Sequence, residues 1–186
     1  ATAAAAVARA GNASGIRIER HQGFLSDHYD PRSRTLRLSP DVYDGRSVAS
    51  IAVAAHEAGH AIQHAVAYPA LGMRSALVPI ANIGNSLWSL PFLIGMMLAG
   101  GQDAARGSAA GQTLMSIGIL MFAGVVLFQM VTLPVEFDAS RRAKAVLAQA
   151  GIVQTSEEAR GVDTVLDAAA LTYVAAALAG ALQLIA

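Results

Sequence analysis

Three residues at a fixed spacing could carry metal-dependent hydrolysis, because His56, Glu57 and His60 form the pattern His-Glu-x-x-His. Histidines four residues apart lie on one face of a helix, where both imidazoles can bind the same zinc ion. The glutamate between them can then act on water at that ion. Residues 47–55, just before the motif, are rich in Ala, Val and Ile, and a helix is expected there. The pattern predicts a hydrolytic zinc site; the alternative is a chance pair of packing histidines.

A catalytic zinc site needs a third protein ligand and an open fourth position for water. The chain contains no Cys, which leaves His and carboxylates as donors. Glu136 is the candidate, because it directly follows an apolar segment and begins an expected helix, with Pro134 just ahead of the first turn. The alternative is a first-turn glutamate that is stabilised by the helix dipole.

The composition indicates a membrane protein, since 54% of the 186 residues are hydrophobic and only 14% are charged. Residues 75–102, 107–135 and 168–186 contain no charged side chain, and each run is long enough to cross a hydrocarbon layer of about 30 Å. Two crossings would return Glu136 to the side of the histidine motif. Twelve of the 13 Lys and Arg residues would lie on that side, with Arg106 opposite. The positive-inside rule therefore predicts a cytoplasmic site.

The expected elements make one mostly α-helical domain, 1–186, with a small β-hairpin. Its parts are 1–75 with the zinc-motif helix, 76–134 with two membrane helices, and 135–186 with the third-ligand helix and a closing apolar helix. Two alternating stretches, 16–19 and 35–38, are expected to pair as the hairpin across a turn-rich connection. The first 14 residues are expected to contain the tail of an alanine-rich helix that ends at Gly11-Asn12. Further helices are expected over 46–68, 76–99, 112–134 and 136–150, with a Gly- and Ala-rich linker over 100–111. Because the chain begins at Ala1 without Met, a segment upstream of it is also expected.

Several motifs together resemble those of the neutral zinc metallopeptidases of bacterial membranes, almost from end to end of the chain. They are Asp27-His28-Tyr29-Asp30-Pro31, His56-Glu57-Ala58-Gly59-His60-Ala61-Ile62-Gln63-His64, Arg74-Ser75-Ala76-Leu77-Val78-Pro79, Leu133-Pro134-Val135-Glu136-Phe137 and Ala169-Ala170-Leu171-Thr172-Tyr173-Val174. The resemblance implies a zincin-like endopeptidase with one Zn²⁺, embedded in the bacterial cytoplasmic membrane as a multi-pass protein.

A more distant similarity is to the CAAX prenyl endopeptidase and heat-shock membrane protease group, whose Glu-x-x-Ala-Asp motif supplies the third ligand. Glu136 and Ala139 match that motif, while Ser140 stands at the position of its Asp. The hydrogen bond that this Asp would give a zinc histidine must come from Ser140 or another group, or be absent.

Other residues are weaker candidates. His64 lies one turn beyond His60, either as a polar residue at a helix end or as a group that supports the ligands or contacts substrate. Tyr173 lies in an apolar helix, as an interfacial anchor or a stabiliser of the oxyanion. His28 is expected in a surface turn, with zinc or substrate contact as the alternative. The strand over 35–38 could offer an edge to an extended substrate, or serve only in the hairpin.

The leading expectation is a zinc endopeptidase that cuts peptides or membrane-protein segments near the membrane surface, with Glu57 as general base and then acid. A non-catalytic zinc-stabilised scaffold or chaperone-like membrane protein is the first rival, although it would have no use for Glu57. A transporter or channel subunit is the second, and the uncharged membrane segments disfavour it. The net charge of zero and the lack of a basic tract disfavour nucleic-acid binding.

Overall fold

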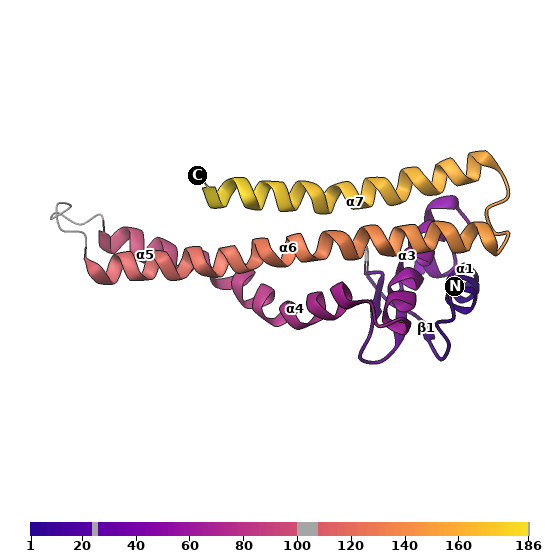
Figure 1. Cartoon of the computed structure of the whole chain (residues 1–186), viewed down its shortest axis with the longest axis horizontal. Coiled ribbons are helices and arrows are strands. Elements are labelled where there is room, and N and C mark those ends of the chain that lie inside the picture. Colours follow the sequence, from indigo (N-terminus) through magenta and orange to yellow (C-terminus); the bar gives the residue numbers. More distant parts are fainter. Residues whose placement is uncertain (24–25, 100–107, 186) are drawn as a thin grey trace. The chain divides into compact units, whose positions relative to one another are not determined.

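The computed structural model describes residues 1–23, 26–99 and 108–185. The chain divides into two compact units, of which the first comprises 1–72 and 133–172 and the second comprises 73–132 and 173–186. The fold is mostly α-helical with one small sheet, as the sequence predicts (Figure 1). Most of the expected linker over 100–111, including Arg106, lies outside the described residues.

The first unit is built around helix α3, Val48–Ala65, which carries the histidine motif. Ser47 caps this helix, because its hydroxyl accepts a hydrogen bond from the backbone N–H of Ser50 at 3.1 Å. The helix is shorter than the 46–68 expected, and Pro69 is instead the first residue of the next helix, a favourable place for a residue without an N–H. The other short helices of this unit are α1 (Thr2–Ala10) and α2 (Pro40–Tyr43).

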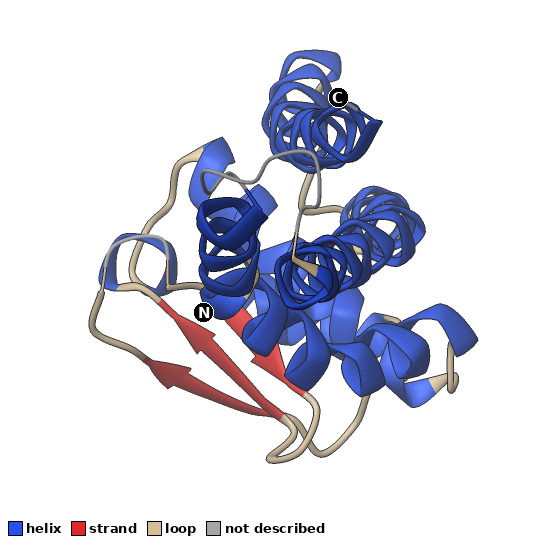
Figure 2. Ribbon diagram, turned by 90° about the vertical axis from the view of Figure 1, so that its left-hand side faces the viewer, coloured by secondary structure: helices blue, strands red, loops and turns tan. Residues whose placement is uncertain are grey.

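The sheet has three strands in the order β1-β3-β2, and it differs from the expected hairpin (Figure 2). The strands are β1 (Arg17–Arg20), β2 (His28–Asp30) and β3 (Thr35–Leu38). β1 pairs with β3 in parallel, and the antiparallel hairpin is formed by β2 and β3. The prediction was wrong because the turn-rich connection itself contains β2, which reverses the chain twice and brings β3 back in the direction of β1. β3 is therefore paired on both sides and offers no edge to a substrate.

The core of the first unit is made largely of small side chains, which let its helices approach closely. Ala52, Ala55 and Ala58 of α3 are completely or almost completely buried, and so are Leu36 and Leu38 of β3. Together with residues of α1 they form one apolar cluster, which also includes Ala143, Leu147, Val162 and Leu166 from the last two helices of the chain. Burial of this cluster stabilises the helix that carries the motif.

The apolar helices differ from the expected ones in two places. Their bounds are α4 (Pro69–Leu87), α5 (Ser89–Ala99), α6 (Ala109–Gln149) and α7 (Ser156–Ile185). The single helix expected over 76–99 is broken at Trp88 with a bend of 42°. Pro91 explains the break, since it lacks the N–H that would bond to the carbonyl of Leu87.

The second difference concerns the helices expected over 112–134 and 136–150, which are one uninterrupted helix, α6, of 41 residues (Figure 1). Pro134 lies inside this helix, and Glu136 is therefore not a first-turn residue. Its alternative interpretation as a dipole-stabilised N-terminal glutamate is wrong. α6 and α7 are each long and apolar enough to cross a membrane, and α4 with α5 could form a third, broken span.

Within the second unit, α5 packs closely against the N-terminal part of α6 through glycine. A Cβ atom placed on Gly118 would lie 2.7 Å from the Cβ of Phe92 and 2.8 Å from the carbonyl oxygen of Trp88. Close approach at small residues is the usual way in which helices associate in lipid. Large apolar side chains such as Met97 and Leu120 point outward, with exposed fractions of 77% and 74%.

Candidate metal centre

The two motif histidines lie on the same face of α3, one turn apart. Their ring centroids are 4.8 Å apart and the rings are almost perpendicular, at 84°. His60 is buried, with an exposed fraction of 6%, and His56 is partly buried. α3 thus presents two imidazoles to one point.

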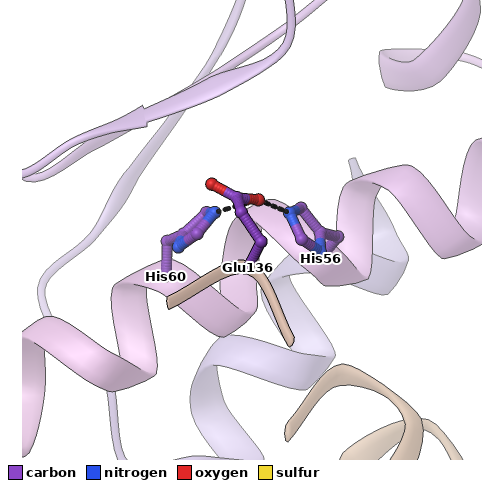
Figure 3. Close-up of side chains that lie close together, drawn as sticks. All are labelled: His56, His60 and Glu136. Carbon is purple, nitrogen blue, oxygen red and sulfur yellow. Dashed lines mark hydrogen bonds and ion pairs between the residues drawn. The ribbon is translucent and has the colours of Figure 1, made fainter. Parts of the chain in front are cut away.

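Glu136 reaches that point from α6 and lies between the two rings (Figure 3). Its Oε2 atom is 3.0 Å from Nε2 of His56 and 3.5 Å from Nε2 of His60, and its exposed fraction is only 2%. One ligating atom from each residue lies within 4.8 Å of the others, so the three residues form a group that could hold a metal ion. The sequence placed the same three residues together.

The donor set fits zinc. Two imidazoles and one carboxylate are the ligands of a known class of catalytic zinc site, which leaves a fourth position open. Ligands about 2.0–2.1 Å from a tetrahedral ion are roughly 3.3 Å from one another. The distances from Oε2 of Glu136 to the two Nε2 atoms, 3.0 and 3.5 Å, lie on either side of this value.

A glycine allows α6 to approach the histidines closely. A Cβ atom placed on Gly59 would lie 2.4 Å from the backbone carbonyl oxygen of Ala139 and 3.0 Å from its carbonyl carbon. Ala139 belongs to the turn of α6 that also carries Glu136 and Ser140. The spacing of the motif alone does not predict this contact between Gly59 and the backbone of α6.

The second nitrogen of each imidazole also has a polar neighbour. The Nδ1 atom of His56 is 3.1 Å from the hydroxyl of Ser140, and the Nδ1 atom of His60 is 3.0 Å from Oε1 of Gln63. These contacts leave the Nε2 atom of each ring facing Glu136. Ser140 therefore lies beside a motif histidine, the position at which the sequence offered it as a hydrogen-bond partner. The contact of Gln63 with His60 was not predicted.

Glu57 lies beside the group and connects α3 with strand β2. Its carboxylate accepts a hydrogen bond from the backbone N–H of Tyr29 at 3.1 Å. Burial is the main reason why the pKa of Glu57 is raised to about 7. The carboxylates of Glu136 and Asp27 also raise this pKa, while the charge of His56 and the hydrogen bond from Tyr29 lower it. A carboxyl group with such a pKa can both accept and release a proton near neutral pH.

His64 and His28, the other two histidines considered, make contacts outside the group. The Nδ1 atom of His64 is 2.8 Å from the hydroxyl of Tyr29, so His64 contacts the side chain of the residue whose backbone binds Glu57. His28 is exposed, and its Nδ1 atom lies 2.8 Å from the carbonyl oxygen of Ser26. Tyr173 belongs to the second unit and is 39% exposed, and its role in stabilising an oxyanion stays a prediction.

Sequence reasoning missed two buried polar residues. Gln63 is completely buried and Asp138 is 3% exposed, and a hydrogen bond of 2.9 Å joins them. Asp138 also accepts hydrogen bonds from Arg141 and Arg142. A signal was available in the spacing, since Gln63 follows His60 by three residues and must share its helical face.

Comparisons with known proteins give a family and a relative. Residues 1–186 match the family described as "Putative neutral zinc metallopeptidase". The chain is also 46% identical over 170 residues to the "Putative membrane protease YugP" of Bacillus subtilis (strain 168), an alignment that covers 91% of this chain and 70% of the relative. No solved structure matches the chain significantly.

Proposed function

The chain belongs to this neutral zinc metallopeptidase family, and from that membership we propose that it is a zinc-dependent endopeptidase that acts at a membrane. The observation that carries the proposal is the convergence of His56, His60 and Glu136 beside the carboxylate of Glu57. A site that only stabilises the fold has no need of a carboxylate base next to the ligands, and it usually fills the fourth position with protein.

The residues of the site have two tasks in the proposed reaction, metal binding and proton transfer. His56, His60 and Glu136 would hold the ion through Nε2, Nε2 and a carboxylate oxygen. When bound, zinc supplies Lewis acidity, which polarises the peptide carbonyl and lowers the pKa of water. Glu57 takes a proton from the attacking water and passes it to the leaving amine, a contribution usually worth about 10²- to 10⁴-fold in rate. A cation beside Glu57 also lowers the pKa of its carboxyl group and favours the ionised base.

We propose peptides or membrane-protein segments near the membrane surface as substrates. The apolar helices α6 and α7 and the membrane-protease name of the relative support membrane association. We also propose a multi-pass topology in the bacterial cytoplasmic membrane, which the long uncharged runs and the family support. The proposal of a site on the cytoplasmic side is supported by the distribution of Lys and Arg along the sequence.

The test measures metal and cleavage together in detergent-purified protein. We expect about one zinc per wild-type chain by elemental mass spectrometry, a marked loss in Glu136→Ala, and cleavage of a quenched fluorescent peptide library by the wild type. Glu57→Gln should keep zinc and lose cleavage, because the amide cannot accept the proton. Wild-type protein that binds no zinc even after reconstitution refutes the proposal. Zinc binding without any cleavage favours the scaffold instead.

A further inference from the structure

The buried amide of Gln63 is surrounded by three polar partners. Its Oε1 atom is 3.0 Å from Nδ1 of His60, and its Nε2 atom is 2.8 Å from the carbonyl oxygen of Val135 and 2.9 Å from Oδ2 of Asp138. Gln63 is completely buried, so no exchange with bulk water competes with these bonds.

The partners fix which end of the amide faces His60. The carbonyl oxygen of Val135 and the carboxylate of Asp138 can only accept hydrogen bonds, and the group between them must therefore be the NH₂. The opposite end, facing His60, is then the amide oxygen, which also only accepts. Nδ1 of His60 must therefore donate.

This hydrogen bond determines the tautomer of a neutral His60. With its single ring proton on Nδ1, the lone pair lies on Nε2, the atom that faces Glu136. The corresponding contact of His56 does not impose this choice, because the hydroxyl of Ser140 can donate or accept. Gln63 is therefore the neighbour that specifies a ligand-ready imidazole.

Asp138 holds the amide in this orientation and is itself held. Its carboxylate is 3% exposed and is compensated by the guanidinium groups of Arg141 and Arg142. The guanidinium of Arg142 also lies 5.7 Å from the ring centre of Tyr68. The carboxylate of Asp138, at the end of this series of hydrogen bonds, is thus itself held by two guanidinium groups.

We propose that Gln63, oriented by Asp138 and the carbonyl of Val135, is a positioning residue that sets the tautomer and ring orientation of His60 for metal binding. This inference rests on the proposed zinc site. Groups that support a metal-binding histidine in this way usually contribute about 10- to 100-fold to metal affinity. A loss of that size is expected when Gln63 loses its acceptor.

The first experiment reads the tautomer without metal. In protein labelled with ¹⁵N-histidine and stripped of metal, the ring nitrogen shifts should show the proton of His60 on Nδ1. The variant Gln63→Met, with similar length but without the amide acceptor, should lose this preference. A wild-type His60 with its proton on Nε2 overturns the inference, whether or not any variant folds.

The second experiment measures zinc affinity by competition with a chromophoric chelator, and coordination by the visible spectrum of the Co²⁺ form. Gln63→Met should bind zinc about 10- to 100-fold more weakly than the wild type. The exposed Gln149→Met is the matched control and should bind zinc as the wild type does.

The outcomes separate the two proposals. Unchanged zinc affinity and an unchanged His60 tautomer in Gln63→Met overturn the positioning role while the zinc site stands. Failure of the wild type itself to bind zinc overturns the proposed function and this inference together. A weaker zinc affinity in Gln63→Met together with a lost preference for the Nδ1 proton of His60 supports the positioning role, since a general packing defect would not move the ring proton.

Discussion

The substitution Gly59→Ala tests whether the contact between α3 and α6 builds the metal centre. The added Cβ would lie 2.4 Å from the carbonyl oxygen of Ala139, where ordinary contacts begin at 3.4 Å, so the helices must separate by about 1 Å. The obstacle is backbone on both helices, which cannot rotate away as a side chain could. The separation of 3.0 Å between Nε2 of His56 and Oε2 of Glu136 would grow to about 4 Å.

Two opposing terms set the stability of this variant. Overpacking of a rigid contact costs about 1–3 kcal/mol. Replacing a mid-helix glycine by alanine returns up to about 1 kcal/mol. The expected net loss is about 1–2 kcal/mol, or a fall of about 2–8 °C in the thermal unfolding temperature for a chain of this size. Misplacement of the ligand by about 1 Å should also lower cleavage about 10²-fold and reduce bound zinc.

The assay compares thermal unfolding and zinc content in detergent with a matched glycine. Gly72→Ala is the control, because Gly72 lies in α4 with no atom within 4 Å of an added Cβ, and the change should stabilise or be neutral. Gly59→Ala that is as stable as Gly72→Ala, with a full complement of zinc, would refute the reasoning.

Three further predictions concern other contacts. Ser140→Ala removes the polar neighbour of His56 and should weaken zinc binding about 10-fold in chelator competition. Hydrogen bonds, chiefly from the hydroxyl of Ser33, lower the pKa of Asp30 to about 2. Because this pKa is lowered, the ionised carboxylate of Asp30 stabilises the folded chain above about pH 4. The stabilisation is lost as the pH falls towards 2. After a discount for the partly exposed carboxylate, the free energy of unfolding should exceed that of Asp30→Asn by about 1 kcal/mol at pH 6, with the difference vanishing near pH 2 in denaturant titrations. Gly118→Val should separate α5 from α6 and lower the thermal unfolding temperature of the chain in detergent, while the helical circular dichroism at 25 °C stays unchanged.

The candidate ligands could be predicted from two features of the sequence. One is the spacing of the histidines, and the other is the number of expected membrane crossings before Glu136. The spacing of four residues predicts that His56 and His60 lie on one face of a helix. Glu136 can be predicted because two membrane crossings would return the chain to the side of the motif, where this carboxylate directly follows the second apolar segment. Both inferences hold whatever the detailed packing of the helices.

The supporting contacts could not be predicted because they depend on where two helices cross. Gln63 and Asp138 are ordinary polar residues until α3 and α6 meet at Gly59 and bring their side chains within 2.9 Å. The prediction of a hairpin between 16–19 and 35–38 was wrong for a similar reason. The segment between the two predicted strands is rich in turn residues, so its composition does not predict a strand. His28–Asp30 forms a strand because it pairs with β3.

The first unit is interrupted in the chain, and this sets the order in which its parts are made. His56 precedes Glu136 by 80 residues, and the larger segment of the second unit, 73–132, is synthesised between them. At about 5–20 residues per second, the ribosome needs roughly 4–16 s to pass from the motif to the third ligand. During that time a nascent chain carries His56, Glu57 and His60 without the carboxylate of Glu136, which completes the group. The group that could hold a metal ion is therefore complete only after residues 73–132 have been synthesised, and a chain that stops earlier carries the two histidines without their carboxylate partner.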